Sequence, residues 1–124
     1  NADRVLVDAP CSELGSLRRG PDVRFRTAPD VLGHFPPLQA DILAHAADLV
    51  RPGGRLVYAT CTVNRAENQD LATAFLASRP DFQLVRPGQG WLPEACVREG
   101  FLFVAPHQHG TDAFFAAVME RSAG

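Results

Sequence analysis

Two cysteines follow short apolar segments of the chain, and a thiol is a side chain well suited to covalent chemistry. Cys11 stands in an Asp-Ala-Pro-Cys-Ser segment at residues 8–12, and Cys61 stands in a Tyr-Ala-Thr-Cys-Thr segment at residues 58–62. Asp8, which opens the first segment, adds a carboxylate. A cysteine without a chemical role is usually a small buried hydrophobe, and an aspartate here could simply cap a turn.

The remaining potential ligands do not form a metal site or a disulfide framework. The third cysteine, Cys96, makes the set odd, and no two cysteines have CxxC spacing. We interpret Cys96 as a packed hydrophobe. His107 and His109 are two residues apart without a third ligand, which favours a polar loop over a metal site. A set of cysteines that does not look like a disulfide framework favours a reducing compartment, so we expect a cytoplasmic protein.

A cluster of arginines follows Cys11 within nine positions. Its members are Arg18, Arg19, Arg24 and Arg26. A guanidinium group suits contact with phosphate, so these residues are candidates for nucleic-acid backbone contacts. A solvated loop, in which they pair with Asp22 and Asp30, is an equally open interpretation. The net charge of −2 shows no general basic footprint of the kind that nucleic-acid binding proteins often have.

Composition and periodicity predict one α/β domain. The 124 residues are 46% hydrophobic and 21% charged, which excludes a disordered chain, and no apolar run is long enough for a membrane span. We expect two helices and a set of short strands. The helices are predicted at 38–50 and 64–78, and the strands at 4–7, 55–60, 82–85, 101–105 and 113–119, the last two paired antiparallel.

This order of elements favours a mostly parallel sheet that is covered on both faces and ends in an antiparallel strand pair. Ligands of such sheets bind beyond the carboxyl ends of the strands. Asp8, Cys11 and Cys61 follow the first two strands, so we expect them to converge at one rim. Asn64 and Glu67 are predicted to cap the second helix.

These segments together resemble the RsmB/Nop/Sun family of RNA cytosine carbon-5 methyltransferases. The Asp-Ala-Pro-Cys-Ser segment is similar to that family's motif IV, and the Thr-Cys segment is similar to its motif VI. Further similarity lies in Pro52-Gly53-Gly54, in residues 65–68 and in residues 109–112, which precede Phe114 and Phe115. Glu13 and Ala113 depart from the family pattern. The resemblance implies a Rossmann-like fold and a methyltransferase activity that depends on S-adenosylmethionine.

The resemblance also implies a division of labour between the cysteines. Cys61 would attack carbon-6 of cytosine, and Cys11 would assist the breakdown of the adduct. Asp8 would lie between the base and the cofactor, in contact with the pyrimidine. The target would be single-stranded or flipped RNA, with ribosomal RNA the first candidate, because both faces of the base must be reached.

One expected feature is missing from the sequence. No glycine-rich cofactor loop occurs, and the chain starts at Asn1 rather than at Met. We therefore expect residues 1–124 to be the C-terminal part of one catalytic domain, with only one edge of the cofactor site. Such a piece is expected to self-associate through an exposed sheet edge. A DNA cytosine methyltransferase and a non-catalytic half-domain remain the alternative interpretations.

Overall fold

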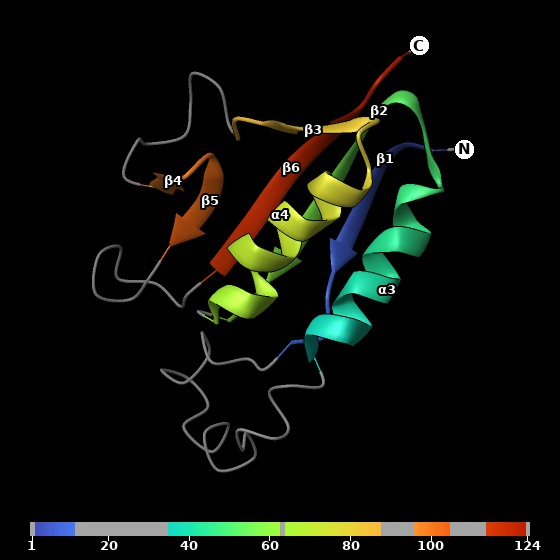
Figure 1. Cartoon of the computed structure of the whole chain (residues 1–124). Helices are drawn as coiled ribbons and strands as arrows, with labels where there is room; N and C mark the ends of the chain where they lie inside the picture. The colour runs from blue at the N-terminus through green and yellow to red at the C-terminus, as the bar shows by residue number, and fades with distance from the viewer. Residues whose placement is uncertain (1, 12–34, 63, 88–95, 105–113, 124) are drawn as a thin grey trace.

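The computed structural model describes residues 2–11, 35–62, 64–87, 96–104 and 114–123. These residues form one mixed sheet with helices packed on it (Figure 1). The strands are β1 (Ala2–Asp8), β2 (Val50–Thr60), β3 (Phe82–Val85), β4 (Val97–Arg98), β5 (Phe101–Val104) and β6 (Phe114–Arg121). The helices are α3 (Phe35–Ala47), the single 3₁₀ turn η2 (Arg65–Glu67) and α4 (Gln69–Ser78).

The sheet is built around β6, the last of the described strands. Its order is β1-β2-β6-β5-β4, and β3 also pairs with β6. Strands β1 and β2 are parallel, while the other four pairings are antiparallel. The predicted α/β class and the antiparallel pairing of the last two predicted strands, now β5 and β6, are confirmed.

Side chains that alternate between the two faces of the strands place one face of the sheet in the core. In β2, Leu56, Tyr58 and Thr60 are fully buried, and so are their partners in β6, which are Met119, Ala117 and Phe115. This is the period of two expected when one face packs against other elements. Helices α3 and α4 lie on that face (Figure 1) and contribute Leu43, Leu71 and Phe75 to the core.

The prediction of helices on both faces is therefore not met within the residues that the structure describes. Both helices lie on the same side of the sheet and contact each other. In β1, Val7 points into the core, whereas Leu6 is 70% exposed. Periodicity shows that an element has an apolar face, but it does not show which side of the sheet a helix crosses.

Several element boundaries differ from the prediction. Helix α3 begins at Phe35, with Pro36 and Pro37 in its first turn, where no intrahelical N–H bond is lost. Strand β2 already begins at Val50, which was predicted to end the helix. The predicted helix 64–78 is divided into η2 and α4. The two-residue strand β4 was not predicted.

Glycine permits the close approach of β1 and β2 near their start. Gly53 has a φ of +82°, a conformation that favours glycine. A Cβ atom on Gly54 would lie 2.9 Å from the carbonyl oxygen of Asp3 in β1. The Pro-Gly-Gly segment at residues 52–54 is thus an irregular first part of β2.

Candidate active site

Parallel pairing brings the two cysteine loops to one edge of the sheet. Asp8 is in register with Ala59, and the N–H of Ala9 donates to the carbonyl of Ala59 at 3.0 Å. Cys11 follows three residues after Asp8, and Cys61 follows two residues after Ala59. The predicted convergence at the carboxyl ends of these strands is therefore what the backbone shows. Both cysteines are partly buried, and neither forms a disulfide.

Tyr58 lies beside the Cys11 loop. Burial raises the pKa of the Tyr58 hydroxyl well above its usual range, and the charges of Glu67 and Cys11 raise it further. The Tyr58 hydroxyl donates to the backbone carbonyl of Glu67 at 2.7 Å. Tyr58 is therefore a neutral hydrogen-bond donor that ties the end of β2 to η2.

The backbone on either side of Cys61 is held by Asn68. Its amide nitrogen donates to the carbonyl of Thr62 at 2.8 Å, and its amide oxygen accepts from the Thr60 hydroxyl at 2.5 Å. The N–H of Asn64 donates to the Thr62 hydroxyl oxygen at 3.2 Å. Since Thr60, Thr62 and Asn68 are fully buried, these bonds fix the loop from which Cys61 projects.

Gln39 holds the backbone next to Cys11. From a fully buried position on α3, its amide nitrogen donates to the carbonyl of Pro10 at 2.8 Å and to Oε1 of Glu67 at 3.0 Å. Asn64 donates from its side chain to Oε2 of Glu67 at 2.7 Å. The sequence motifs do not single out Gln39, although its position four residues before the buried Leu43 places a polar side chain on the apolar face of α3.

The predicted cap at Asn64 is confirmed in part. Oδ1 of Asn64 accepts from the N–H of Ala66 at 3.2 Å, as a cap does. Glu67 does not reach back to the N–H of Asn64, because its carboxylate is buried against Gln39. The capped element is the short η2, and Asn68 precedes α4 without a side-chain cap.

Asp8 offers a carboxylate at the same rim. It is exposed at the end of β1, and its side chain makes no hydrogen bond or ion pair within the described part of the chain. Such a carboxylate is free to accept hydrogen bonds from a ligand above the strand ends. Because a carboxylate accepts hydrogen bonds, the chemistry of Asp8 fits the donor groups of S-adenosylmethionine.

The remaining predicted site residues fall elsewhere. Arg18, Arg19, Arg24 and Arg26 lie outside the described residues, and so do His107 and His109. Cys96 is partly buried just before β4. In the strand order of the sheet, β4 lies at the opposite edge from β1 and β2. In the described ranges, no group of His, Cys, Asp and Glu side chains could hold a metal ion, and no helix could span a membrane.

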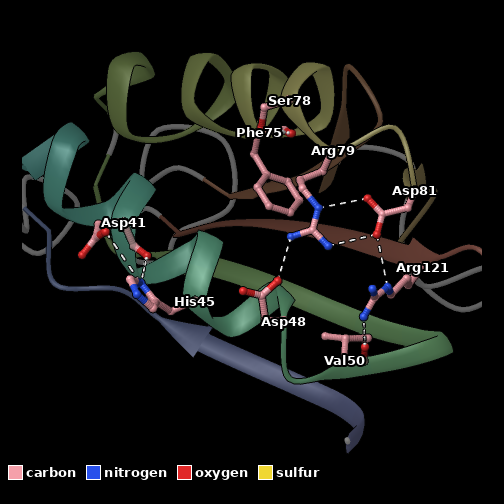
Figure 2. Close-up of polar contacts among 9 residues, drawn as sticks. All are labelled: Asp41, His45, Asp48, Val50, Phe75, Ser78, Arg79, Asp81 and Arg121. Atoms are coloured by element: carbon pink, nitrogen blue, oxygen red, sulfur yellow. Dashed lines mark hydrogen bonds and ion pairs between the residues drawn. The ribbon is translucent and has the colours of Figure 1, made fainter.

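A second polar cluster lies at the opposite end of β2 and is structural (Figure 2). Asp81 accepts two hydrogen bonds from Arg79, at 2.9 and 3.0 Å, and one from Arg121 at 3.1 Å. Arg121 also donates to the carbonyl of Val50 at 2.5 Å, and Arg79 donates to Asp48 at 3.2 Å. These bonds join the ends of α3, α4 and β6 far from the cysteines.

Comparison with known proteins identifies relatives of the whole chain. A "Probable ribosomal RNA small subunit methyltransferase B" from Bacillus subtilis is 43% identical over 122 residues, covering 96% of this chain and 27% of the relative. The protein of the same name from Synechocystis is 41% identical over 123 residues, covering 97% of this chain and 27% of the relative. The chain thus spans about a quarter of the length of these relatives.

Solved structures give the same result for the fold. The crystal structure of PH0851 matches with a TM-score of 0.87 and 39% identity, over 97% of this chain and 27% of that one. NSun6 from Pyrococcus horikoshii with SFG matches with a TM-score of 0.68 and 27% identity, over 96% of this chain and 29% of that one. The predicted methyltransferase fold is therefore confirmed. The 16S rRNA methyltransferase RsmB/F family matches residues 1–120, and the chain belongs to this family of methyltransferases.

Proposed function

We propose that the full-length protein that contains these residues methylates carbon-5 of a cytosine in RNA, with ribosomal RNA as the substrate. The observation that carries the proposal is the pair of partly buried cysteines on loops that leave the same edge of the sheet. Family membership supports an RNA substrate, because the relatives are named as ribosomal RNA methyltransferases.

The proposed reaction begins with the thiolate of Cys61. It adds to carbon-6 of the cytosine, and the electron pair of the 5,6 double bond moves to carbon-5, which becomes nucleophilic. S-adenosylmethionine, when bound, supplies the methyl group that carbon-5 takes up. A base then removes the proton from carbon-5, the 5,6 double bond re-forms, and the sulfur–carbon-6 bond breaks to return the thiolate.

Cys11 and Asp8 have supporting roles in this proposal. Cys11 assists the last step, in which the enzyme leaves the methylated base. Asp8 hydrogen-bonds the pyrimidine and favours its protonated, electrophilic form, since a carboxylate at the strand ends can accept from the base. Residues 1–124 serve as the C-terminal part of the catalytic domain, and Asp8 serves as one edge of the cofactor site.

Two cysteine variants of the full-length protein test the assignment. Cys61→Ala should abolish both methyl transfer and the covalent protein–RNA adduct. Cys11→Ala should accumulate the adduct, because release is impaired. Cys96→Ala is the matched control and should behave as the parent protein. If Cys11→Ala lost the adduct while Cys61→Ala accumulated it, the roles would be reversed, as in a DNA cytosine methyltransferase. If the parent protein itself transferred no methyl group and formed no adduct, a non-catalytic binding domain would replace the proposal.

The arginine cluster is proposed to contact RNA phosphates. Replacing Arg18, Arg19, Arg24 or Arg26 with Gln should weaken RNA binding and reduce the slope of log affinity against log salt by roughly 0.7–0.9 per lost contact. Arg51→Gln is the control, since Arg51 lies at the start of β2, the end away from Cys61, where it pairs with Asp3. Unchanged slopes in all four variants would identify the cluster as a solvated loop.

The compartment follows from the chemistry of the site. None of the three cysteines forms a disulfide, and the proposed mechanism needs the thiolate of Cys61 in reduced form. We therefore propose that the protein acts in the cytoplasm, where thiols are kept reduced.

A further inference from the structure

The amide of Gln39 joins the loop of Cys11 to the loop of Cys61. Both of its N–H groups are used, one on the carbonyl of Pro10 and one on the carboxylate of Glu67. Pro10 directly precedes Cys11. Gln39 itself belongs to α3, which lies outside both cysteine loops and is packed against the sheet. A rigid element therefore reaches the Cys11 loop through one side chain.

The link continues to Cys61 through Glu67. The second oxygen of its carboxylate accepts from the side chain of Asn64 at 2.7 Å, and the backbone N–H of Asn64 donates to the hydroxyl of Thr62 at 3.2 Å. Thr62 directly follows Cys61. A continuous series of hydrogen bonds thus runs from the residue before one cysteine to the residue after the other. Its members are Pro10, Gln39, Glu67, Asn64 and Thr62.

The other polar atom of the Gln39 amide bears on what this residue does. Its oxygen, Oε1, is buried and has no hydrogen-bond partner in the part of the chain that the structure describes. Burying an acceptor without a partner destabilises the folded state. An apolar side chain of the same length would avoid this cost, but it would leave the Pro10 carbonyl and the buried Glu67 carboxylate without the Gln39 donor. The two donated bonds are what glutamine adds.

We propose that Gln39 is a positioning residue for Cys11 in the reaction. This inference rests on the proposed function, in which Cys11 assists the release of an adduct held on Cys61. By fixing the carbonyl of Pro10 relative to Glu67 and the Cys61 loop, Gln39 sets where Cys11 lies with respect to the bound base. Loss of the Gln39 amide then impairs release of the adduct and leaves its formation by Cys61 unchanged, because Asn68 independently holds the backbone on both sides of Cys61.

Gln39→Met in the full-length protein tests the inference, because methionine keeps the length of the side chain and removes both donors. The rate of adduct release should fall by about ten-fold, the effect of losing one typical hydrogen bond. The adduct should accumulate while its rate of formation and the KM for RNA stay unchanged. Leu43→Met is the matched control. It places methionine one turn further along the same buried face of α3, and it should release the adduct as the parent protein does.

A second variant covers the case in which Gln39→Met does not fold. In that case the second variant is Gln39→Asn, which keeps the amide but is one methylene shorter, so it cannot reach both Pro10 and Glu67, and the same accumulation is expected. Release at the parental rate in a folded variant would overturn the inference. The inference would also be overturned if the rates of adduct formation and adduct release both fell in proportion to the fraction of protein that is folded. Failure of the proposed function is distinguishable, because Cys11→Ala itself would then trap no adduct.

Discussion

Removing a single hydroxyl from Tyr58 should destabilise the fold measurably. Tyr58 is fully buried, and its hydroxyl donates to the carbonyl of Glu67 at 2.7 Å. Tyr58→Phe keeps the ring, including its edge-to-face packing on Phe115, and removes only the donor. The loss leaves a carbonyl without this donor in a buried setting, which costs about 1–3 kcal/mol of unfolding free energy. For a domain of this size, Tm should fall by roughly 5–15 °C.

Thermal and urea unfolding of both proteins, followed by circular dichroism, measure this effect. Ser78→Ala is the matched control, because it also removes a hydroxyl that donates to a backbone carbonyl, that of Phe75 (Figure 2). The carbonyl of Phe75 still accepts from the N–H of Arg79 at 3.0 Å, so this variant should change the unfolding free energy by about 0.5 kcal/mol or less. If Tyr58→Phe were no less stable than Ser78→Ala, the buried bond would not stabilise the fold as argued.

Tyr58 offers a second readout, since the chain contains a single tyrosine. Burial and the nearby charges of Glu67 and Cys11 raise the pKa of its hydroxyl. Ultraviolet titration should therefore show no phenolate at the ordinary tyrosine pKa of about 10 while the protein is folded, and phenolate should appear only on alkaline unfolding. Titration at the ordinary value in the folded protein would refute the buried environment on which the stability estimate depends.

Three further outcomes are expected. Hydrogen bonds from Arg79 hold the pKa of Asp81 below its ordinary value of 3.8, so Asp81 stabilises the fold fully above that value, and this contribution is lost as the pH falls through the lowered pKa. Asp81→Asn should therefore show a weaker loss of stability in acid, and an unchanged acid dependence would contradict this. The bond from His45 to the Asp41 carbonyl and the charge of Asp41 raise the His45 pKa above 6.5, so its NMR titration midpoint should lie above that value and should fall in Asp41→Asn. The 124-residue polypeptide alone should sediment as more than a 13.4 kDa monomer, through the free edge of β1, and should bind S-adenosylmethionine very weakly. Leu6→Lys should reduce the association, whereas a monomer with micromolar cofactor affinity would contradict both expectations.

The sequence was sufficient to predict most of what positions the cysteines. Short β-branched runs at 4–7 and 55–60 predict β1 and β2, and the position of each cysteine after a strand predicts the shared rim. The antiparallel pair formed by β5 and β6 was predictable from two apolar runs and the polar residues between them. These features are local, so they can be predicted from the composition and the hydrophobic periodicity of short segments.

Features that depend on tertiary contacts were not predictable in the same way. The pairing of Gln39 with Pro10 and Glu67 joins residues 29 and 28 positions apart, and no local pattern specifies such a partner. Glu67 was interpreted as a helix cap because the spacing from Asn64 fits, but burial directs its carboxylate to Gln39 instead. The side of the sheet on which α4 lies also follows from its packing against α3, and not from its own sequence.

The central position of β6 has a consequence for how the protein is made. This strand follows β2, β3 and β5 along the chain, yet it separates β2 from both β3 and β5 in the sheet. During synthesis, β2, β3 and β5 leave the ribosome without the neighbour that joins them, and the buried face of β2 has no complete core to enter. Pairing between strands so far apart in the sequence must wait until β6 has emerged from the ribosome. The two thiols are therefore translated well before the frame that places them, and chaperones that bind exposed strands have a window in which to act.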